Sequence, residues 1–141
     1  MASEIATAKD GLATLIGNIS GMVQVFDYPP DGVHETPSMV LQFQGRDPQQ
    51  TIGGSTFLGT LRGTMLINSA SNKQAFDKLD EFMEPLGTNS VEAAVDSDNT
   101  WGGSVDTGKL TSIENVGFRE IGGGRYAGAD FVFEFMKGVA S

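Results

Sequence analysis

The chain has 141 residues, a length that suits one domain with its own core and is too short for two ordinary domains. Its 18 acidic and 9 basic side chains give a net charge of −9, which argues against tight nucleic-acid binding, because phosphate contacts need clustered Lys and Arg. The absence of cysteine excludes a disulfide framework and thiolate metal sites. No apolar run is long enough for a membrane span or a signal peptide, so we expect the chain to be made in a cytoplasm and to stay there.

The first half of the chain predicts one helix and two strands. Residues 4–17 predict a helix, because apolar side chains recur there at helical spacing and Ser3 can cap its start. A short strand follows over residues 22–26, and the two prolines in residues 27–32 force a turn. Pro37 opens a second strand, whose apolar face carries Met39, Leu41 and Phe43.

Residues 44–56 are predicted to form a long polar loop, because the stretch is too long for a tight hairpin turn and too polar to be buried. The loop is either simply solvated or an arm that becomes ordered against a neighbouring subunit, since long loops often carry function. The candidate interface residues of this arm are Arg46, Asp47, Gln49 and Gln50.

The second half predicts a strand over residues 57–67, a main helix over 72–84, a single-turn helix ending at Val95, and strands over 109–118 and 125–136. Gly59 and Gly63 lie on the apolar face of the first of these strands, which suggests that a helix packs closely over them. The whole chain, residues 1–141, therefore predicts a single α+β domain with a mostly antiparallel β-sheet and α-helices packed on one face.

Three local patterns resemble parts of chemical sites, and none has the residues that such a site needs. The single histidine, His34, lies in a proline-flanked loop without a nucleophile motif. Asp96 and Asp98 resemble the start of a calcium loop, but the glycine and glutamate that such a loop needs further on are missing. The Gly53–Thr56 turn lacks the lysine and the following helix of a phosphate loop. We therefore expect no enzyme, no catalytic residues, no cofactor and no metal site.

Two further features bear on partners. The stretch from Asp77 to Asp106 holds eight acidic residues against one base, Lys78, and predicts either a solvated helix face or an acidic surface. Such a surface could line a channel for DNA, because it repels the polyanion and lets it slide past. Trp101 is the only tryptophan and lies in a polar turn, so it is either a core residue or an interface residue.

The order of these features resembles the tail terminator proteins of long-tailed, siphovirus-type bacteriophages. The resemblance covers nearly the whole chain, from about residue 12 to 136, and rests on segments in a fixed order: Asp27-Tyr28-Pro29-Pro30, Gly53-Gly54-Ser55-Thr56, Gly87-Thr88-Asn89-Ser90-Val91, Asp98-Asn99-Thr100-Trp101-Gly102-Gly103 and Tyr126-Ala127-Gly128-Ala129-Asp130-Phe131. No single segment is diagnostic, and small proteins of the tail tube and neck share related α+β folds.

The resemblance implies a structural virion protein of the tail and neck. Six copies would form a ring on the head-proximal end of the finished tail tube, stop tube polymerisation and offer a docking surface to the head-to-tail connector or stopper protein. DNA would pass through the lumen without sequence-specific binding, and no membrane would be involved. The alternatives are another tail or neck subunit, such as a tube protein or head-to-tail adaptor, or a soluble α+β domain that binds a small ligand.

Overall fold

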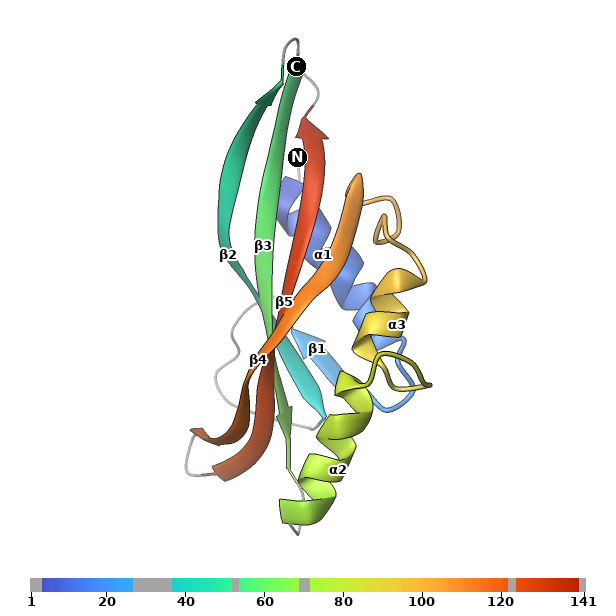
Figure 1. Ribbon diagram of the computed structural model, residues 1–141, viewed down its shortest axis with the longest axis vertical. Helices are drawn as coiled ribbons and strands as arrows, with labels where there is room; N and C mark the ends of the chain where they lie inside the picture. Colours follow the sequence, from blue (N-terminus) through green and yellow to red (C-terminus); the bar gives the residue numbers. More distant parts are fainter. Residues whose placement is uncertain (1–3, 27–36, 52–53, 69–71, 122–123, 140–141) are drawn as a thin grey trace.

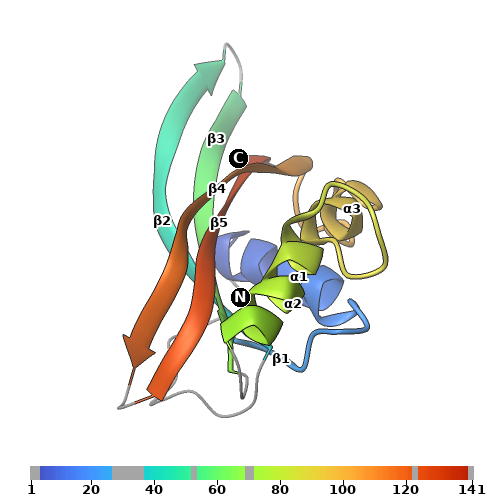
Figure 2. The same cartoon turned by 60° about the horizontal axis from the view of Figure 1, so that its bottom comes forward.

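Five strands form one sheet, and three helices lie together on one of its faces (Figures 1 and 2). The structure is a computed structural model that describes residues 4–26, 37–51, 54–68, 72–121 and 124–139. Its elements, in chain order, are α1 (Glu4–Gly17), β1 (Gln24–Phe26), β2 (Ser38–Thr51), β3 (Gly54–Ile67), α2 (Asn72–Met83), α3 (Val91–Asp96), β4 (Thr107–Ile121) and β5 (Gly124–Val139). The predicted α+β class is confirmed.

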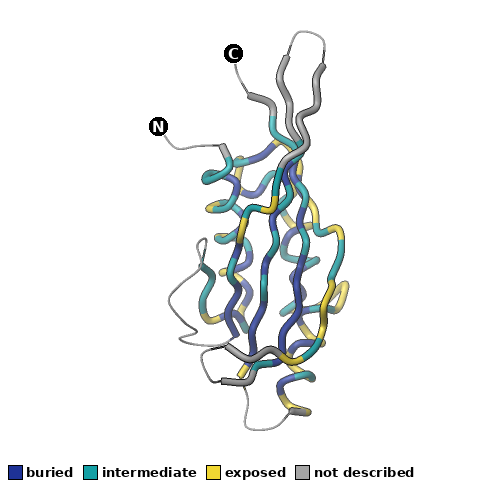
Figure 3. The backbone as a smooth tube through the Cα atoms, turned by 90° about the vertical axis from the view of Figure 1, so that its left-hand side faces the viewer, coloured by how far each residue is buried: buried dark blue, intermediate teal, exposed yellow. Residues whose placement is uncertain are grey.

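The sheet has the strand order β1-β2-β3-β5-β4. The pairs β2–β3, β3–β5 and β5–β4 are antiparallel, whereas the three residues of β1 pair in parallel with the start of β2. Figure 3 looks onto the face opposite the helices, where no described helix lies in front of the strands. Among the described helices, none combines the length and the apolarity needed to cross a bilayer.

The prediction of a loop over residues 44–56 is wrong. Gln44–Thr51 continues β2, and Gly54–Thr56 begins β3, so the two strands pair in register from Ser38↔Leu66 to Thr51↔Gly54 as one long hairpin. Beyond Val40, β2 has no strand on its outer side among the described residues. A strand at an edge tolerates Pro48, because only a central strand needs every backbone N–H as a donor.

The core fills the space between the helices and the inner face of the sheet. On β5, Phe131, Phe133 and Phe135 point into it and are at most 1% exposed, as their alternation predicts. Burying a side chain of this size stabilises the fold by about 1.5–3 kcal/mol. On β3, Leu61 and Met65 meet this layer and are fully buried.

The two strand glycines make room for side chains rather than for a helix, which corrects the expectation stated above. A Cβ added at Gly59 would lie 2.4 Å from the ring of Phe135, and one added at Gly63 would lie 2.6 Å from the sulfur of Met39. Both neighbours come from strands adjacent to β3. The glycines therefore let large side chains of β5 and β2 fold over the central strand.

Each long helix buries the stripe that its sequence predicts. Ala8, Leu12 and Ile16 of α1 are fully buried, and so is Leu79 of α2. Leu86 does not continue the stripe of α2, because the helix ends at Met83, and its side chain is 80% exposed. The predicted caps at Ser3 and Ser71, the turn over residues 27–32 and His34 lie outside the described residues.

Candidate assembly surfaces

The predicted arm residues Arg46, Asp47, Gln49 and Gln50 all lie on β2, in the part of the hairpin that runs along the sheet edge. Their interface role stays a prediction. The structure places Trp101 away from them, beside β4 at the opposite edge of the sheet. The five predicted interface residues therefore do not form one surface.

Trp101 belongs to the core. Its side chain is fully buried, and its ring lies 5.6 Å from the ring of Phe135. It covers Gly108 so closely that a Cβ added there would lie 2.4 Å from the indole. A side chain without exposed surface cannot contact a partner directly, so of the two open interpretations the structure supports the core one.

The acidic turn that resembles a calcium loop has a structural role in holding Trp101. The carboxylate of Asp98 accepts hydrogen bonds from the Thr100 backbone N–H, the Thr100 hydroxyl and the Gly102 N–H. The hydroxyl of Thr100, then the N–H groups of Gly102 and Thr100, lower the pKa of Asp98 from its ordinary value. These bonds fix a turn in which Trp101 adopts a φ of 49°, a conformation uncommon for a bulky residue.

The face of the sheet opposite the helices, hereafter the uncovered face, carries a polar network at its centre. Asp130 of β5 accepts hydrogen bonds from Arg62 at 2.9 Å, Thr64 at 3.1 Å and Asn115 at 2.8 Å. Its side chain is only 8% exposed. The network joins three neighbouring strands, β3, β5 and β4, and its donors satisfy a carboxylate that would otherwise be costly to bury.

The same network neutralises a cation. The guanidinium of Arg62 forms a close ion pair with Asp130, and its other nitrogen lies 3.9 Å from the carboxylate of Glu114. On the same face, Lys109 stands directly opposite Glu134 in the pairing of β4 with β5. Arg62 and Lys109 thus each have a carboxylate beside them, which reduces the positive charge that these two side chains offer to phosphate groups.

Two sheet edges are the most conspicuous candidates for assembly. At one edge, β2 runs from Leu41 to Thr51 without a strand on its outer side among the described residues. At the other edge, β4 runs over 15 residues with two bulges, between Leu110 and Ser112 and between Glu114 and Gly117. An open edge is a template for pairing with another chain, and bulges restrict which pairing is possible.

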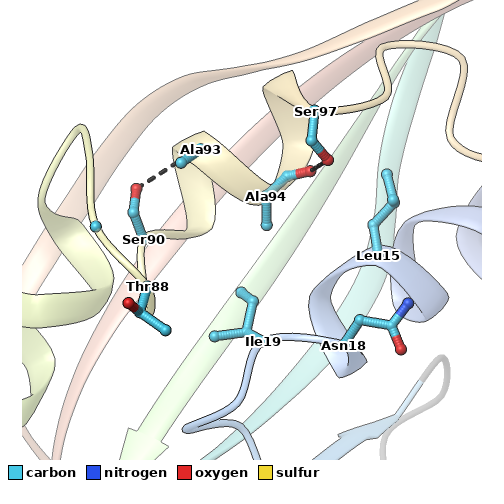
Figure 4. Close-up of a pocket in the computed structure, with 9 residues that line it drawn as sticks. Leu15, Asn18, Ile19, Thr88, Ser90, Ala93, Ala94 and Ser97 are labelled. Carbon is cyan, nitrogen blue, oxygen red and sulfur yellow. Dashed lines mark hydrogen bonds between the residues drawn. The ribbon is translucent and has the colours of Figure 1, made fainter.

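The helix side offers a shallow hollow of about 330 Å3 between the end of α1, the loop after α2, and α3 (Figure 4). The hydroxyl of Ser90, the N-cap of α3, accepts from the Ala93 N–H, and the hydroxyl of Ser97 donates to the Ala94 carbonyl. No charged side chain is among the described residues that line it: Leu15, Asn18, Ile19, Gly87, Thr88, Ser90, Ala93, Ala94 and Ser97. A ligand site usually needs a few convergent polar groups, and the hydroxyls of Ser90 and Ser97 are already bonded to the backbone, so this hollow lends little support to a ligand-binding function.

The acidic side chains of α2 lie on the solvent face of the helix. Asp77, Asp80 and Glu81 are exposed, as is Glu84 just after the helix, and Lys73 pairs with Asp77 at 2.8 Å one turn away. This hydrogen bond is the main cause of the raised pKa of Lys73. An exposed pair of this kind adds little stability, so the face is a solvated surface with net negative charge.

Comparison with known proteins adds no family to this geometry. A scan against protein-family models gives no match for the chain, and a search of curated proteins gives none either.

Proposed function

We propose that this chain is a structural subunit whose copies close into a ring that caps the head-proximal end of a phage tail tube. The ring stops tube polymerisation and offers its other face to the head connector, and DNA passes through its lumen. The order of sequence features that resembles tail terminator proteins supports this function, and so does the shape of the sheet. Six copies follow from the resemblance alone.

The observation that carries the proposal is the direction of the two edge strands. Four long strands, β2, β3, β5 and β4, are antiparallel from one neighbour to the next, so β2 and β4 run in opposite directions. If copies are related by rotation about an axis along the strands, β4 of one copy meets β2 of the next antiparallel to it. Such a head-to-tail contact closes into a ring when the rotation closes.

The free parts of the two edges also lie at the same height on the sheet. Through β3 and β5, Leu41 of β2 is in register with Ile113 of β4, and Asp47 is in register with Thr107. The open stretch 41–47 of one copy can therefore face the stretch 107–113 of the next without a shift along the axis. Strand addition of this kind supplies backbone hydrogen bonds as the main attraction.

In such a ring the helices lie outside and the uncovered face lines the lumen. The charged residues whose strand positions lie on this face are the acids Asp47, Glu114, Asp130 and Glu134 against the bases Arg62, Lys109 and Arg119. Because Asp130 already occupies Arg62, the wall offers DNA few phosphate contacts. A wall of this charge suits passage of a polyanion better than its retention.

The end of the long hairpin, residues 48–51 and 54–57, extends past the level at which β4 begins. In a ring this hairpin end would project from one rim. We assign it to contact with the tail tube protein or the connector, which gives Gln49 and Gln50 an axial role and leaves Arg46 and Asp47 at the lateral contact.

The experiment is to image the purified protein, alone and with tail tubes, beside a variant in which Asn-Gly replaces Gln50–Ser55. This two-residue turn keeps Gln49 opposite Thr56 and so preserves the register of the hairpin. We expect annular particles from both proteins and capping of tubes by the full-length protein only. Capping by the shortened protein would refute the role of the hairpin end.

Two outcomes would favour the alternative functions. Tubes that grow from this protein alone would favour a tube subunit. A melting temperature that is raised by one specific small molecule would favour a ligand-binding domain.

A further inference from the structure

Large apolar side chains are exposed at both lateral edges of the sheet. Val23, just before β1, is 48% exposed at one edge. Val116 and Phe118 of β4, which we name the apolar edge patch, are 50% and 41% exposed at the other. Among the described residues, only one further large apolar side chain, Leu86 on the helix side, is exposed to this extent.

The exposure of the edge patch is built into the backbone of β4. A bulge between Glu114 and Gly117 carries Val116, and Asn115 within it has a φ of 55°. The amide of Asn115 is held by the carboxylate of Asp130, which fixes the bulge to the centre of the uncovered face. Beside it, the ring of Phe118 packs edge-on against Phe76 of α2 at 4.9 Å. The patch is thus a fixed surface and not a loose end of the strand.

The two apolar edges lie at the same height. One row of paired residues crosses the whole sheet, from β1 to β4: Gln24, Ser38, Leu66, Gly128 and Gly117. Because β1 and β4 run in opposite directions, Val23, which precedes the first residue of this row, is level with Phe118, which follows the last. A rotation about an axis along the strands keeps every residue at its own height, so it brings Val23 of one copy to the level of Phe118 of the next.

We infer that Val23 of one copy packs against Phe118 of its neighbour, next to Val116, and that this contact selects head-to-tail assembly of this chain with itself. The inference rests on the ring of the proposed function, but not on its attachment to a tail. It adds a second contact to the strand pairing, because at this height β1 forms the sheet edge and the bulge interrupts β4. An apolar side chain that is half exposed on both partners has area to bury there.

The test uses cysteine pairs, which the chain permits because it has no cysteine of its own. Val23 and Phe118 of one molecule are separated by four strand spacings, roughly 19 Å, so they cannot form a disulfide within one chain. We compare Val23→Cys, Phe118→Cys, the double variant Val23→Cys/Phe118→Cys, and a control, Val23→Cys/Leu86→Cys, after mild oxidation on non-reducing gels. Electron micrographs of the unoxidised proteins record separately whether rings form.

We expect the double variant to give a covalent ladder that ends at the number of subunits in the ring. An equal mixture of the two single variants should stop at dimers, and each single variant and the Leu86 control should stay monomeric. Dimers from a single variant alone would indicate a symmetric contact and overturn the inference, as would an equal ladder from the control. Rings in micrographs without a ladder would refute this contact while leaving the ring intact. Neither rings nor ladder would refute both.

Discussion

The Asp130 network allows a sharp test of how the uncovered face is held together. Replacing Asp130 with Ala removes three hydrogen bonds, from Arg62, Thr64 and Asn115. Hydrogen bonds to a charged group are worth about 1.5–3 kcal/mol each when buried, but these donors reach water, so we take about 1 kcal/mol each. The variant should therefore lose about 3 kcal/mol of unfolding free energy, which corresponds to a melting temperature lower by about 9 °C.

The matched variant Asp130→Asn separates the charge from the hydrogen bonds. Its amide oxygen can accept from Arg62 and Asn115, while its N–H2 group donates to the hydroxyl of Thr64. We expect it to lose only about 1 kcal/mol. Removal of an exposed carboxylate on α2, Glu81→Ala, serves as the control and should change stability by less than about 0.5 kcal/mol.

The assay is urea unfolding at pH 7, followed by circular dichroism, with thermal melts in parallel. A double-mutant cycle with Arg62→Ala then isolates the pairwise energy of the ion pair. If Asp130→Ala unfolds within about 0.5 kcal/mol of the wild type, the network does not hold the face. If Asp130→Asn lowers the free energy of unfolding as much as Asp130→Ala does, the charge of Asp130 rather than its hydrogen-bond geometry stabilises the network.

The remaining predictions concern the Trp101 turn. Gly108→Ala should destabilise the protein by about 1–3 kcal/mol in urea unfolding, because its Cβ would lie 2.4 Å from the indole of Trp101. The control Gly117→Ala should leave stability unchanged, because a Cβ added there meets no atom within 4 Å. Equal effects of the two substitutions would contradict the packing argument. Asp98→Ala should lower the melting temperature at pH 7, and the difference from the wild type should shrink as the pH falls below about 4. The reason is that the pKa of Asp98 is lowered in the folded state, so its stabilisation exists above the unfolded pKa and is lost as the pH falls through the folded one. A difference that grows in acid would contradict this assignment.

The elements with regular alternation could be predicted from the sequence. The helix faces of α1 and α2, the phenylalanine row of β5 and the α+β class all follow from apolar spacing, because one face of each element must be buried. The end of the β2–β3 hairpin could not, because Gly45, Pro48 and the glutamines around it have the composition of a loop. Only the pairing of this stretch with β3 makes it a strand.

The candidate surfaces depend on tertiary topology, which local patterns do not contain. That β2 beyond Val40 and β4 form open edges and run in opposite directions follows from the strand order and pairing. The alternation within each strand is the same at an edge as in the centre, so it does not reveal this. The exposure of Val116 follows from a bulge that its sequence neighbours Asn115 and Gly117 permit but do not require. The choice between a core and an interface role for Trp101 also depends on tertiary structure, because only the fold shows that its polar turn directs the indole into the core.

The central claim is that copies of this chain close side by side into an annulus that ends a tail tube. Electron micrographs of the purified protein mixed with tail tubes test it most directly. The account predicts annular particles and tubes with one end occupied by such a particle, whose growth has stopped. Isolated, non-annular particles beside tubes that continue to elongate would contradict it.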